Sequence, residues 1–331
     1  MTRKISEMGG NAQSPALGSQ EAQNAFNAVI DALAQWREDI AKAAEKNSSK
    51  VYDELASAAE ALELIRPALG RRLLLASDFD GTISRLGLDP WRSSVVPAAQ
   101  RALRSLAAAE DTHVAFISGR AVVDLAGRVA VGGATYHGDH GAQTATAVRG
   151  FRPHHLRVEY EPVDPAVQAM ADRLKAEVPR SIDEDWLVLE DKGASLTFHY
   201  RRAPDVEAAR ERVRTAVEDV DREGLLDQPG GIRMWELRPP GATTKRQALE
   251  RLIEEHRPGL VVMLGDDRND AHAFVAIREA RERDGLEGLA VGVLSPASDR
   301  GQLGRVADVV FAGAHVSARF LTLLARERSR R

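Results

Sequence analysis

The sequence predicts an α/β protein with an open parallel sheet, interrupted by a smaller inserted α+β domain and preceded by a helical hairpin. Three observations support this prediction. From Arg71 to about Gly150, short apolar runs alternate with amphipathic segments; closely spaced strand-like runs follow, and the alternation resumes after Pro240. Strands that alternate with helices are typical of right-handed βαβ units, which build parallel sheets.

The first 70 residues divide into two segments. Residues 1–20 have no apolar stretch behind their basic start, so we expect a flexible leader and not a signal peptide. Residues 21–70 contain two runs with apolar residues at three-and-four spacing, separated by KNSSK, which predicts a helical hairpin. We expect this hairpin to pack against the main body or against a second copy of the chain, which makes it a candidate for self-association.

The parallel-sheet domain is expected to comprise residues 71–150 and 241–331. Its first part offers strands at LLLAS, THVAFIS and ATYHGDHGA, with helices between them at AAQRALRSLAAA and AVVDLAGRVA. Its second part offers helices at TTKRQALERLIEEH and AHAFVAIREAR, and strands at GLVVMLGDD, GLAVGVL and ADVVFA. No internal repeat competes with this interpretation.

The inserted domain is expected at residues 151–240. The stretch DWLVLEDKGASLTFHYRR contains two strand-like runs around a Lys-Gly turn, and GIRMWELRP is a third such run. Two long amphipathic helices are expected at about 165–177 and 205–223. Together these segments indicate a separate small α+β layer.

The composition excludes several classes of protein. The chain has 331 residues and no cysteine, which excludes disulfides, thiol nucleophiles and cysteine-bound metals. No stretch approaches the ~18 consecutive apolar residues of a membrane-spanning helix. The net charge of -4 argues against a nucleic-acid partner, and the basic run RERSRR at the C-terminus is expected to be a solvated helix end. We therefore expect a cytoplasmic protein that binds neither nucleic acid nor membrane.

Polar motifs follow three of the predicted strands. DFDGT follows LLLAS, SGR follows the second strand, and DDRND follows VVMLG. Because ligands bind at the carboxyl ends of parallel strands, these side chains are expected to converge at one edge of the sheet. The residues are Asp78, Asp80, Ser118, Arg120, Asp266, Asp267 and Asp270. Such a concentration of carboxylates needs a hard cation, and oxygen ligands without Cys or His indicate Mg²⁺.

These residue types suit phosphoryl chemistry. A carboxylate can act as a nucleophile and form an acyl-phosphate, and a second carboxyl nearby can serve as general acid and base. Asp78 and Asp80 are suited to share these two roles. Ser118 can hydrogen-bond a phosphoryl oxygen, and Lys245 at a helix start can place a positive charge nearby. Taken singly, each motif has a plainer explanation as a turn, a helix cap or a solvated lysine. The plainer explanations do not account for their joint occurrence at strand and helix ends.

Together, DFDGT, SGR, Lys245 and DDRND resemble the four motifs of the haloacid dehalogenase superfamily in its phosphatase branch. This superfamily has a Rossmann-like parallel-sheet core. The resemblance implies that Asp78 is the nucleophile, Asp80 the general acid/base, and Ser118 and Lys245 the phosphate-binding residues. It implies Asp266 as the principal Mg²⁺ ligand, supported by Asp267 or Asp270, alongside Asp78 and Asp80. The second aspartate of DFDGT favours phosphoester hydrolysis or phosphoryl transfer over dehalogenation.

The inserted domain narrows the resemblance to trehalose-6-phosphate phosphatases. EDKGASLTFHYR, MWELRPPGATTK and YHGDHGAQ are similar to segments of that family, and the similarity runs from about Arg71 to the C-terminal region. In that family an inserted cap domain holds the sugar hydroxyls. The resemblance implies these sugar-binding residues: Glu190, Lys192, Ser195 and Glu236 from the cap, with Arg120 and His140 from the core.

Four residues depart from the family pattern, and two of them, Gln143 and Arg246, bear on sugar specificity. Gln143 stands where the family often has Glu, Asn269, Asp270 and Ala271 stand where it often has Thr-Asp-Glu, and Arg246 stands where it often has Gly. The implied activity is Mg²⁺-dependent hydrolysis of trehalose 6-phosphate. Alternatives remain: a phosphatase for a sucrose, glucosylglycerol or mannosylglycerate precursor, a phosphomutase, or a non-catalytic sugar-phosphate sensor.

Overall fold

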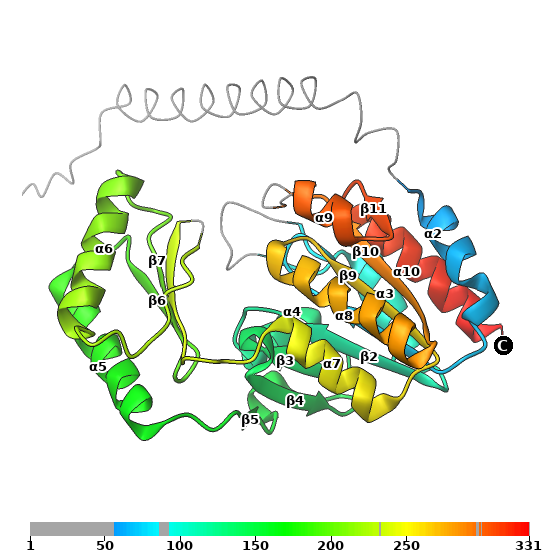
Figure 1. Cartoon of the computed structure of the whole chain (residues 1–331), viewed down its shortest axis with the longest axis horizontal. Helices are drawn as coiled ribbons and strands as arrows, with labels where there is room; N and C mark the ends of the chain where they lie inside the picture. The colour runs from blue at the N-terminus through cyan, green and yellow to red at the C-terminus, as the bar shows by residue number, and fades with distance from the viewer. Residues whose placement is uncertain (1–55, 86–92, 232, 296–297, 299, 331) are drawn as a thin grey trace, which may run out of the picture. The chain divides into compact units, whose positions relative to one another are not determined.

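The computed structural model describes residues 56–85, 93–231, 233–295, 298 and 300–330 (Figure 1). The predicted leader and most of the predicted hairpin lie outside these ranges, and so does any test of self-association through the hairpin. Within them, the hairpin region contributes helix α2 (Ala58–Ile65) and a 3₁₀ turn at Arg66–Ala68. None of the helices in the described ranges is long and apolar enough to cross a membrane.

An eight-stranded sheet forms in the described residues, in the order β11-β10-β9-β1-β2-β3-β4-β5 (Figure 1). The six predicted strands are β1 (Leu73–Ser77), β2 (Thr112–Ile117), β3 (Ala134–Gly138), β9 (Leu260–Gly265), β10 (Glu287–Val293) and β11 (Val309–Phe311). These six pair in parallel, which confirms the α/β prediction. The sequence interpretation missed β4 (Gln143–Ala147), which pairs antiparallel to β3, and β5 (Glu159–Tyr160), which pairs antiparallel to β4. The GDHG turn after β3 is too short for a crossover, so the chain folds straight back.

Helices cover both faces of this sheet. β1 is buried along its whole length; Leu73 and Leu75 pack into one apolar cluster, whereas Leu74 and Ala76 pack into another. The first cluster includes side chains of α2, α3 (Pro97–Leu106), α4 (Val122–Val129) and α10 (Ala314–Ser329). The second includes side chains of α7 (Lys245–His256), α8 (Arg268–Asp284) and α9 (Arg300–Val306). The alternation of side chains along β1 thus anchors both helical layers.

The inserted segment has a core of its own. Strands β6 (Val188–Asp191), β7 (Leu196–His199) and β8 (Met234–Leu237) form an antiparallel sheet, and α5 (Pro165–Ser181) and α6 (Val206–Val220) pack against it. Leu196, Phe198 and Leu237 belong to this apolar cluster, whereas the alternate residues Thr197 and Glu236 line a cavity. The predicted α+β layer therefore forms, while its predicted boundaries at 151 and 240 stay predictions.

The basic C-terminal run is not simply solvated, which corrects the sequence interpretation. Arg328, in the last turn of α10, donates hydrogen bonds to the backbone oxygens of Leu69 (2.6 Å) and Asp111 (3.0 Å) and to Thr112 Oγ1 (2.9 Å). These acceptors flank the starts of β1 and β2. One guanidinium therefore connects α10 to the end of the sheet opposite the DFDGT, SGR and DDRND motifs.

Candidate active site

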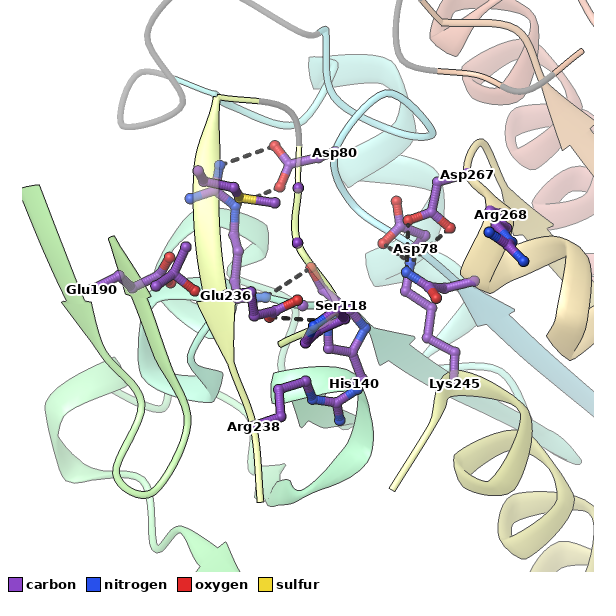
Figure 2. A pocket seen from close by; sticks show the side chains of 18 of the residues that line it. Asp78, Asp80, Ser118, His140, Glu190, Glu236, Arg238, Lys245, Asp267 and Arg268 are labelled. Atoms are coloured by element: carbon purple, nitrogen blue, oxygen red, sulfur yellow. Dashed lines mark hydrogen bonds and ion pairs between the residues drawn. The ribbon is translucent and has the colours of Figure 1, made fainter. Parts of the chain in front are cut away.

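The carboxyl ends of β1, β2 and β9 meet at one edge of the large sheet. Ser77, the last residue of β1, is in register with Phe116 of β2 and Leu264 of β9. The backbone N–H of Asp78 donates to the carbonyl of Leu264 at 2.9 Å, which fixes the residue that follows β1. A cavity of about 780 Å³ opens here, with walls from both the large sheet and the inserted domain (Figure 2).

Most of the predicted site residues line this cavity. They are Asp78, Asp80, Ser118, Arg120, His140, Glu190, Lys192, Glu236, Lys245, Asp266 and Asp267. Asp270 lies directly beside them, because its Oδ1 accepts a hydrogen bond from Lys245. The convergence expected from the strand ends is therefore observed.

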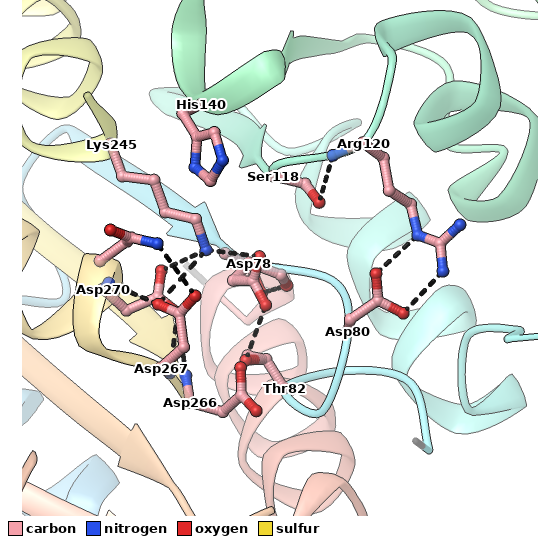
Figure 3. Close-up of polar contacts among 12 residues, drawn as sticks. Asp78, Asp80, Thr82, Ser118, Arg120, His140, Lys245, Asp266, Asp267 and Asp270 are labelled. Carbon is pink, nitrogen blue, oxygen red and sulfur yellow. Dashed lines mark hydrogen bonds and ion pairs between the residues drawn. The ribbon is translucent and has the colours of Figure 1, made fainter. Parts of the chain in front are cut away.

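Lys245 is a buried cation of the site. It is the first residue of α7, whose N-terminus is capped by Thr244. Its Nζ lies 2.8 Å from Asp78 Oδ1 and 2.9 Å from Asp270 Oδ1 (Figure 3). Burial alone would lower the pKa of Lys245, but Asp267, Asp270 and Asp78 together raise it well above its usual value. The ammonium group is therefore charged at neutral pH.

Three buried carboxylates lie close enough to share one cation. One oxygen from each of Asp78, Asp266 and Asp270 lies within 4.8 Å of the others. Burial raises the pKa of all three carboxyls, and the repulsion between neighbouring carboxylates adds to the effect. A single lysine leaves this group with excess negative charge, and oxygen donors are the ligands that Mg²⁺ prefers. The donor set therefore fits a hard divalent cation.

Two glycines permit this crowding. A Cβ on Gly265 would lie 2.2 Å from the Cβ of Asp270, and a Cβ on Gly81 would lie 2.1 Å from Oδ2 of Asp266. Gly81 also has a φ of +77°, a conformation that other residues rarely adopt. The glycines of DFDGT and LGDD are thus required by the close approach of the carboxylates.

Asp267 has a different position from the other predicted metal ligands. It caps α8, and its Oδ1 accepts from the backbone N–H of Asp270 at 2.8 Å. Although burial acts against it, Lys245 and the bonds from Asp270 lower the pKa of Asp267 to about 2. Its Oδ1 is 3.8 Å from Lys245 Nζ. Asp267 is therefore not grouped with the three carboxylates, and its geometry is that of a helix cap facing the lysine.

The side chain of Asp80 is also separate from the carboxylate group, and its predicted place among the metal ligands stays a prediction. Its side chain forms a bidentate ion pair with Arg120, at 2.6 Å from Nε and 3.0 Å from Nη2 (Figure 3). The same guanidinium bonds Asp124 at 2.9 Å and lies over the ring of Phe79. Arg120, predicted to bind sugar, thus holds Asp80 in this structure. A pair formed by residues 40 positions apart depends on packing that local patterns do not reveal.

Ser118 and His140 meet at a strained turn. His140 has a φ of 60° and its backbone N–H donates to the carbonyl of Ser118 at 2.9 Å. A Cβ on Gly119 would lie 2.9 Å from the imidazole of His140, so the glycine of SGR makes room for that ring. Positive φ values at non-glycine residues are costly and gather at functional sites. The turn places His140 between the sheet edge and the inserted domain, 3.5 Å from Glu236.

The inserted domain contributes a buried ion pair. Lys192 Nζ lies 3.0 Å from Glu236 Oε1 and 3.8 Å from Asp139 Oδ1, and both Lys192 and Glu236 are nearly inaccessible to solvent. Burial opposes ionisation of both groups. Even so, Glu236 and the other nearby carboxylates raise the pKa of Lys192, and Lys192 and His140 lower that of Glu236 well below its usual value. Both groups therefore carry charge at neutral pH.

Gln143 links the two domains. Its amide nitrogen donates to the backbone oxygen of Lys192 at 2.6 Å, and its amide oxygen accepts from the N–H of Val122 at 2.9 Å. A glutamate at this position would have no proton to donate to the Lys192 carbonyl when ionised. Gln143, which departs from the family pattern, therefore makes a contact between the large sheet and the inserted domain that an ionised glutamate could not make.

The structure does not bring Ser195 to the main cavity. Ser195 lies at the end of the β6–β7 hairpin, where its carbonyl accepts from the N–H of Lys192, and it borders a second cavity of about 450 Å³. Ser195 precedes β7, and the residues of β7 that line the main cavity, Thr197 and His199, come after it in the chain. Its predicted role in sugar binding therefore has no geometric support in this arrangement.

The sequence interpretation missed several residues that line the main cavity. They are Thr197, His199, Arg201, Arg238, Arg268 and His272. The polar residues of LTFHYR at every second position were a usable signal, since they alternate with Leu196 and Phe198. That signal marks one face of β7 but does not tell which face borders a cavity.

The family model described as trehalose-phosphatase matches residues 76–302. A trehalose-phosphate phosphatase of Mycobacterium leprae is 30% identical over 254 residues, covering 72% of this chain and 56% of that protein. One from Mycobacterium avium is 35% identical over 217 residues, covering 63% of this chain and 52% of that protein. The matched part thus spans about half the length of these relatives.

A solved structure shares the fold. The C-terminal domain of the C. albicans trehalose-6-phosphate phosphatase matches with a TM-score of 0.60 at 21% identity, over 81% of this chain and 97% of that one. At this identity the likeness concerns the fold alone. The predicted haloacid dehalogenase-like α/β architecture is confirmed.

Proposed function

The chain belongs to the trehalose-phosphatase family, and from this membership we propose that it hydrolyses trehalose 6-phosphate to trehalose and inorganic phosphate. The family resemblance predicted from the motifs is thereby confirmed. Because the matched part spans only about half of the curated relatives, activity and substrate are proposed here from the site of this chain.

One observation carries the proposal: a single cavity joins two walls of complementary chemistry. Asp78 and Lys245 on the sheet side are groups suited to a phosphoryl group, and Glu190 and Glu236 on the other side are acceptors for hydroxyl groups (Figure 2). The volume of about 780 Å³ falls in the range of ~300–1,000 Å³ typical of small-molecule sites. A disaccharide phosphate presents one phosphoryl group and many hydroxyls, which matches both walls.

The proposed reaction has two steps. In the first, a carboxylate oxygen of Asp78 forms a bond to phosphorus while the bond from phosphorus to the sugar oxygen breaks, and the carboxyl of Asp80 gives its proton to that oxygen. In the second, water attacks the phosphorus of the aspartyl-phosphate, Asp80 takes the proton of the water, and phosphate and the Asp78 carboxylate are released. Since Asp80 faces Arg120 in the structure, proton transfer requires this ion pair to part.

Other groups stabilise the charge during these steps. Lys245 contacts Asp78 directly and can place its charge near the phosphoryl oxygens, and Ser118 can donate a hydrogen bond to them. Asp78, Asp266 and Asp270 would hold a bound Mg²⁺, and the ion would supply positive charge to offset their excess negative charge and to polarise a phosphoryl oxygen.

The test is phosphate release from a panel of sugar phosphates, measured with and without Mg²⁺. We expect strong, Mg²⁺-dependent preference for trehalose 6-phosphate. Preference for a sucrose, glucosylglycerol or mannosylglycerate precursor would retain the chemistry and replace the substrate. An isomerised sugar phosphate without phosphate release would support a phosphomutase, and no reaction with any member would support a sensor.

A further inference from the structure

One wall of the cavity carries two buried oxygen atoms that lack hydrogen-bond partners in the part of the chain that the structure describes. Thr197 on β7 is 1% exposed and lines the cavity, and its Oγ1 has no hydrogen-bond partner among the described residues. Within the same described ranges, Oε1 of Glu190 has none either. Burying a polar atom without a partner costs free energy, so such atoms in native proteins usually meet a ligand or water. Both residues line the cavity in which the proposed sugar would lie.

The two residues form a cross-strand pair. Glu190 of β6 is in register with Thr197 of β7, which is in turn in register with Glu236 of β8. Register-paired residues of antiparallel strands have Cβ atoms ~4.5–5.5 Å apart on the same face of the sheet. One small polar group lying over this face can therefore reach both side chains.

His199 fixes the orientation of Glu190. Its Nε2 lies 3.0 Å from Oε2 of Glu190, which leaves Oε1 as the oxygen without a partner among the described residues. His199 lies two positions after Thr197 and therefore on the same face of β7. Burial opposes ionisation of Glu190, but the His199 bond and the charge of Lys192 lower the pKa of that carboxyl. Glu190 is thus a pure acceptor at neutral pH.

We propose that Thr197 and Glu190 together recognise one hydroxyl group of the sugar, with His199 as the positioning residue for Glu190. A sugar hydroxyl donates one hydrogen bond and accepts others. The hydroxyl of Thr197 donates to it, and Oε1 of Glu190 accepts from it. This inference rests on the proposed function, because the hydroxyl belongs to the sugar part of the proposed substrate. It makes Thr197 a specificity-determining residue.

The first test is the variant Thr197→Val, which removes the hydroxyl and retains the side-chain shape. We expect kcat/KM for trehalose 6-phosphate to fall about 10- to 100-fold, because a substrate hydroxyl loses its buried partner. For p-nitrophenyl phosphate, which offers no sugar hydroxyl, kcat/KM should stay within about twofold on the same reasoning. Thr197→Ser should recover most of the loss. Thr215→Val, the same change at an exposed position of α6, should alter neither substrate.

The second test identifies the hydroxyl with monodeoxy derivatives of trehalose 6-phosphate. One derivative should be a poor substrate for the wild-type protein. The decrease in kcat/KM caused by removing this hydroxyl should be smaller in Thr197→Val, because the group that remains unpaired in the wild-type protein is then absent as well. If the effects of Thr197→Val and of the missing hydroxyl on the logarithm of kcat/KM were simply additive for every derivative, the proposed contact would be refuted.

The third test concerns His199. His199→Leu should raise KM for trehalose 6-phosphate more than it lowers kcat, and His199→Gln, which retains a donor, should recover part of the change. Equal loss with the aryl phosphate would indicate a merely structural role.

Failure of the inference differs from failure of the proposed function. If the wild-type protein prefers another sugar phosphate, the proposed substrate fails and the same ratios are measured with that sugar phosphate. If Thr197→Val impairs both substrates equally, or neither, the inference fails while the proposed function stands. If no sugar phosphate is hydrolysed, both fail.

Discussion

The two walls of the cavity differ in how completely their buried polar groups are paired. On the sheet side, Lys245 lies within 2.9 Å of both Asp78 and Asp270, so much of the buried charge is already paired within the chain. On the inserted-domain side, the buried lysine–glutamate pair is also closed, but Thr197 Oγ1 and one oxygen of Glu190 lack partners among the described residues. We infer that the first wall is built to hold a reacting group, whereas the second is completed only by a ligand. Substitutions on the two walls should therefore fail differently.

The largest effect is expected for Asp78→Asn on the sheet side. The amide removes the proposed nucleophile, so turnover of both trehalose 6-phosphate and p-nitrophenyl phosphate should fall by at least about 10³-fold. The melting temperature should not fall, because burial already raises the pKa of Asp78 and disfavours its charge. Phosphate release and thermal unfolding measure the two quantities.

The matched control is Asp172→Asn, an exposed aspartate of α5, which should retain full activity. Near-normal turnover of Asp78→Asn would refute the nucleophile assignment. Loss of the folded state in that variant would instead contradict the inference that the charge of Asp78 serves the reaction and does not stabilise the fold.

The same contrast explains how far the sequence could predict each wall. Asp78, Asp266 and Asp270 directly follow or lie just beyond apolar strands, and parallel topology alone brings such residues to one edge. Thr197 and His199 are isolated polar residues in a short strand, and alternation with apolar neighbours does not say what their face contacts. Contacts distant in sequence were also beyond local patterns.

Two such contacts involve charged residues whose partners the sequence did not indicate. Asp80 was predicted among the metal ligands, which stays a prediction, and its carboxylate pairs with Arg120 from the next strand end. Arg328 was predicted to be solvated, but it binds carbonyls of segments more than 200 positions away. In both cases the side chain type was read correctly as charged, and its partner depended on tertiary packing.

A smaller and more selective effect is expected for Lys192→Met on the inserted-domain side. Removing the amine breaks the buried pair with Glu236, and breaking such a pair typically costs ~3–5 kcal/mol of unfolding free energy. The value of kcat/KM should fall about 100-fold for trehalose 6-phosphate and far less for p-nitrophenyl phosphate, which does not need the sugar wall. Steady-state kinetics with both substrates and urea unfolding test this.

Lys175→Met provides the matched control for this variant. Lys175 lies on α5 and pairs with Asp172 and Asp191 near the surface, so its loss should leave both substrates unaffected. If Lys192→Met impaired the two substrates equally, the inserted domain would have no part in sugar specificity. The comparison between the walls would then lose its functional meaning.

The smallest effect on activity is expected at His137, a partly buried histidine of β3 that does not line the main cavity. Burial lowers the pKa of His137 to about 4, and His113, His256 and Arg251 act in the same direction. Its Nε2 has no partner among the described residues. Because His137 lies away from the proposed substrate, its substitution should change the stability of the protein and leave turnover unchanged.

The sign of this effect follows from proton binding. An unfolded histidine has a pKa near ~6.5, so between pH 6.5 and 4 the unfolded chain binds a proton that folded His137 does not. The free energy of unfolding should therefore fall as the pH decreases through this window, by about 2 kcal/mol at pH 5 from this residue alone. Urea midpoints at pH 7 and pH 5 should separate less in His137→Gln than in the wild-type protein, whereas His315→Gln at an exposed position should behave like wild type. An unchanged separation in His137→Gln would mean that the folded protein accommodates the charged imidazole, and a buried atom without a partner would then be no sign of a site that needs a ligand.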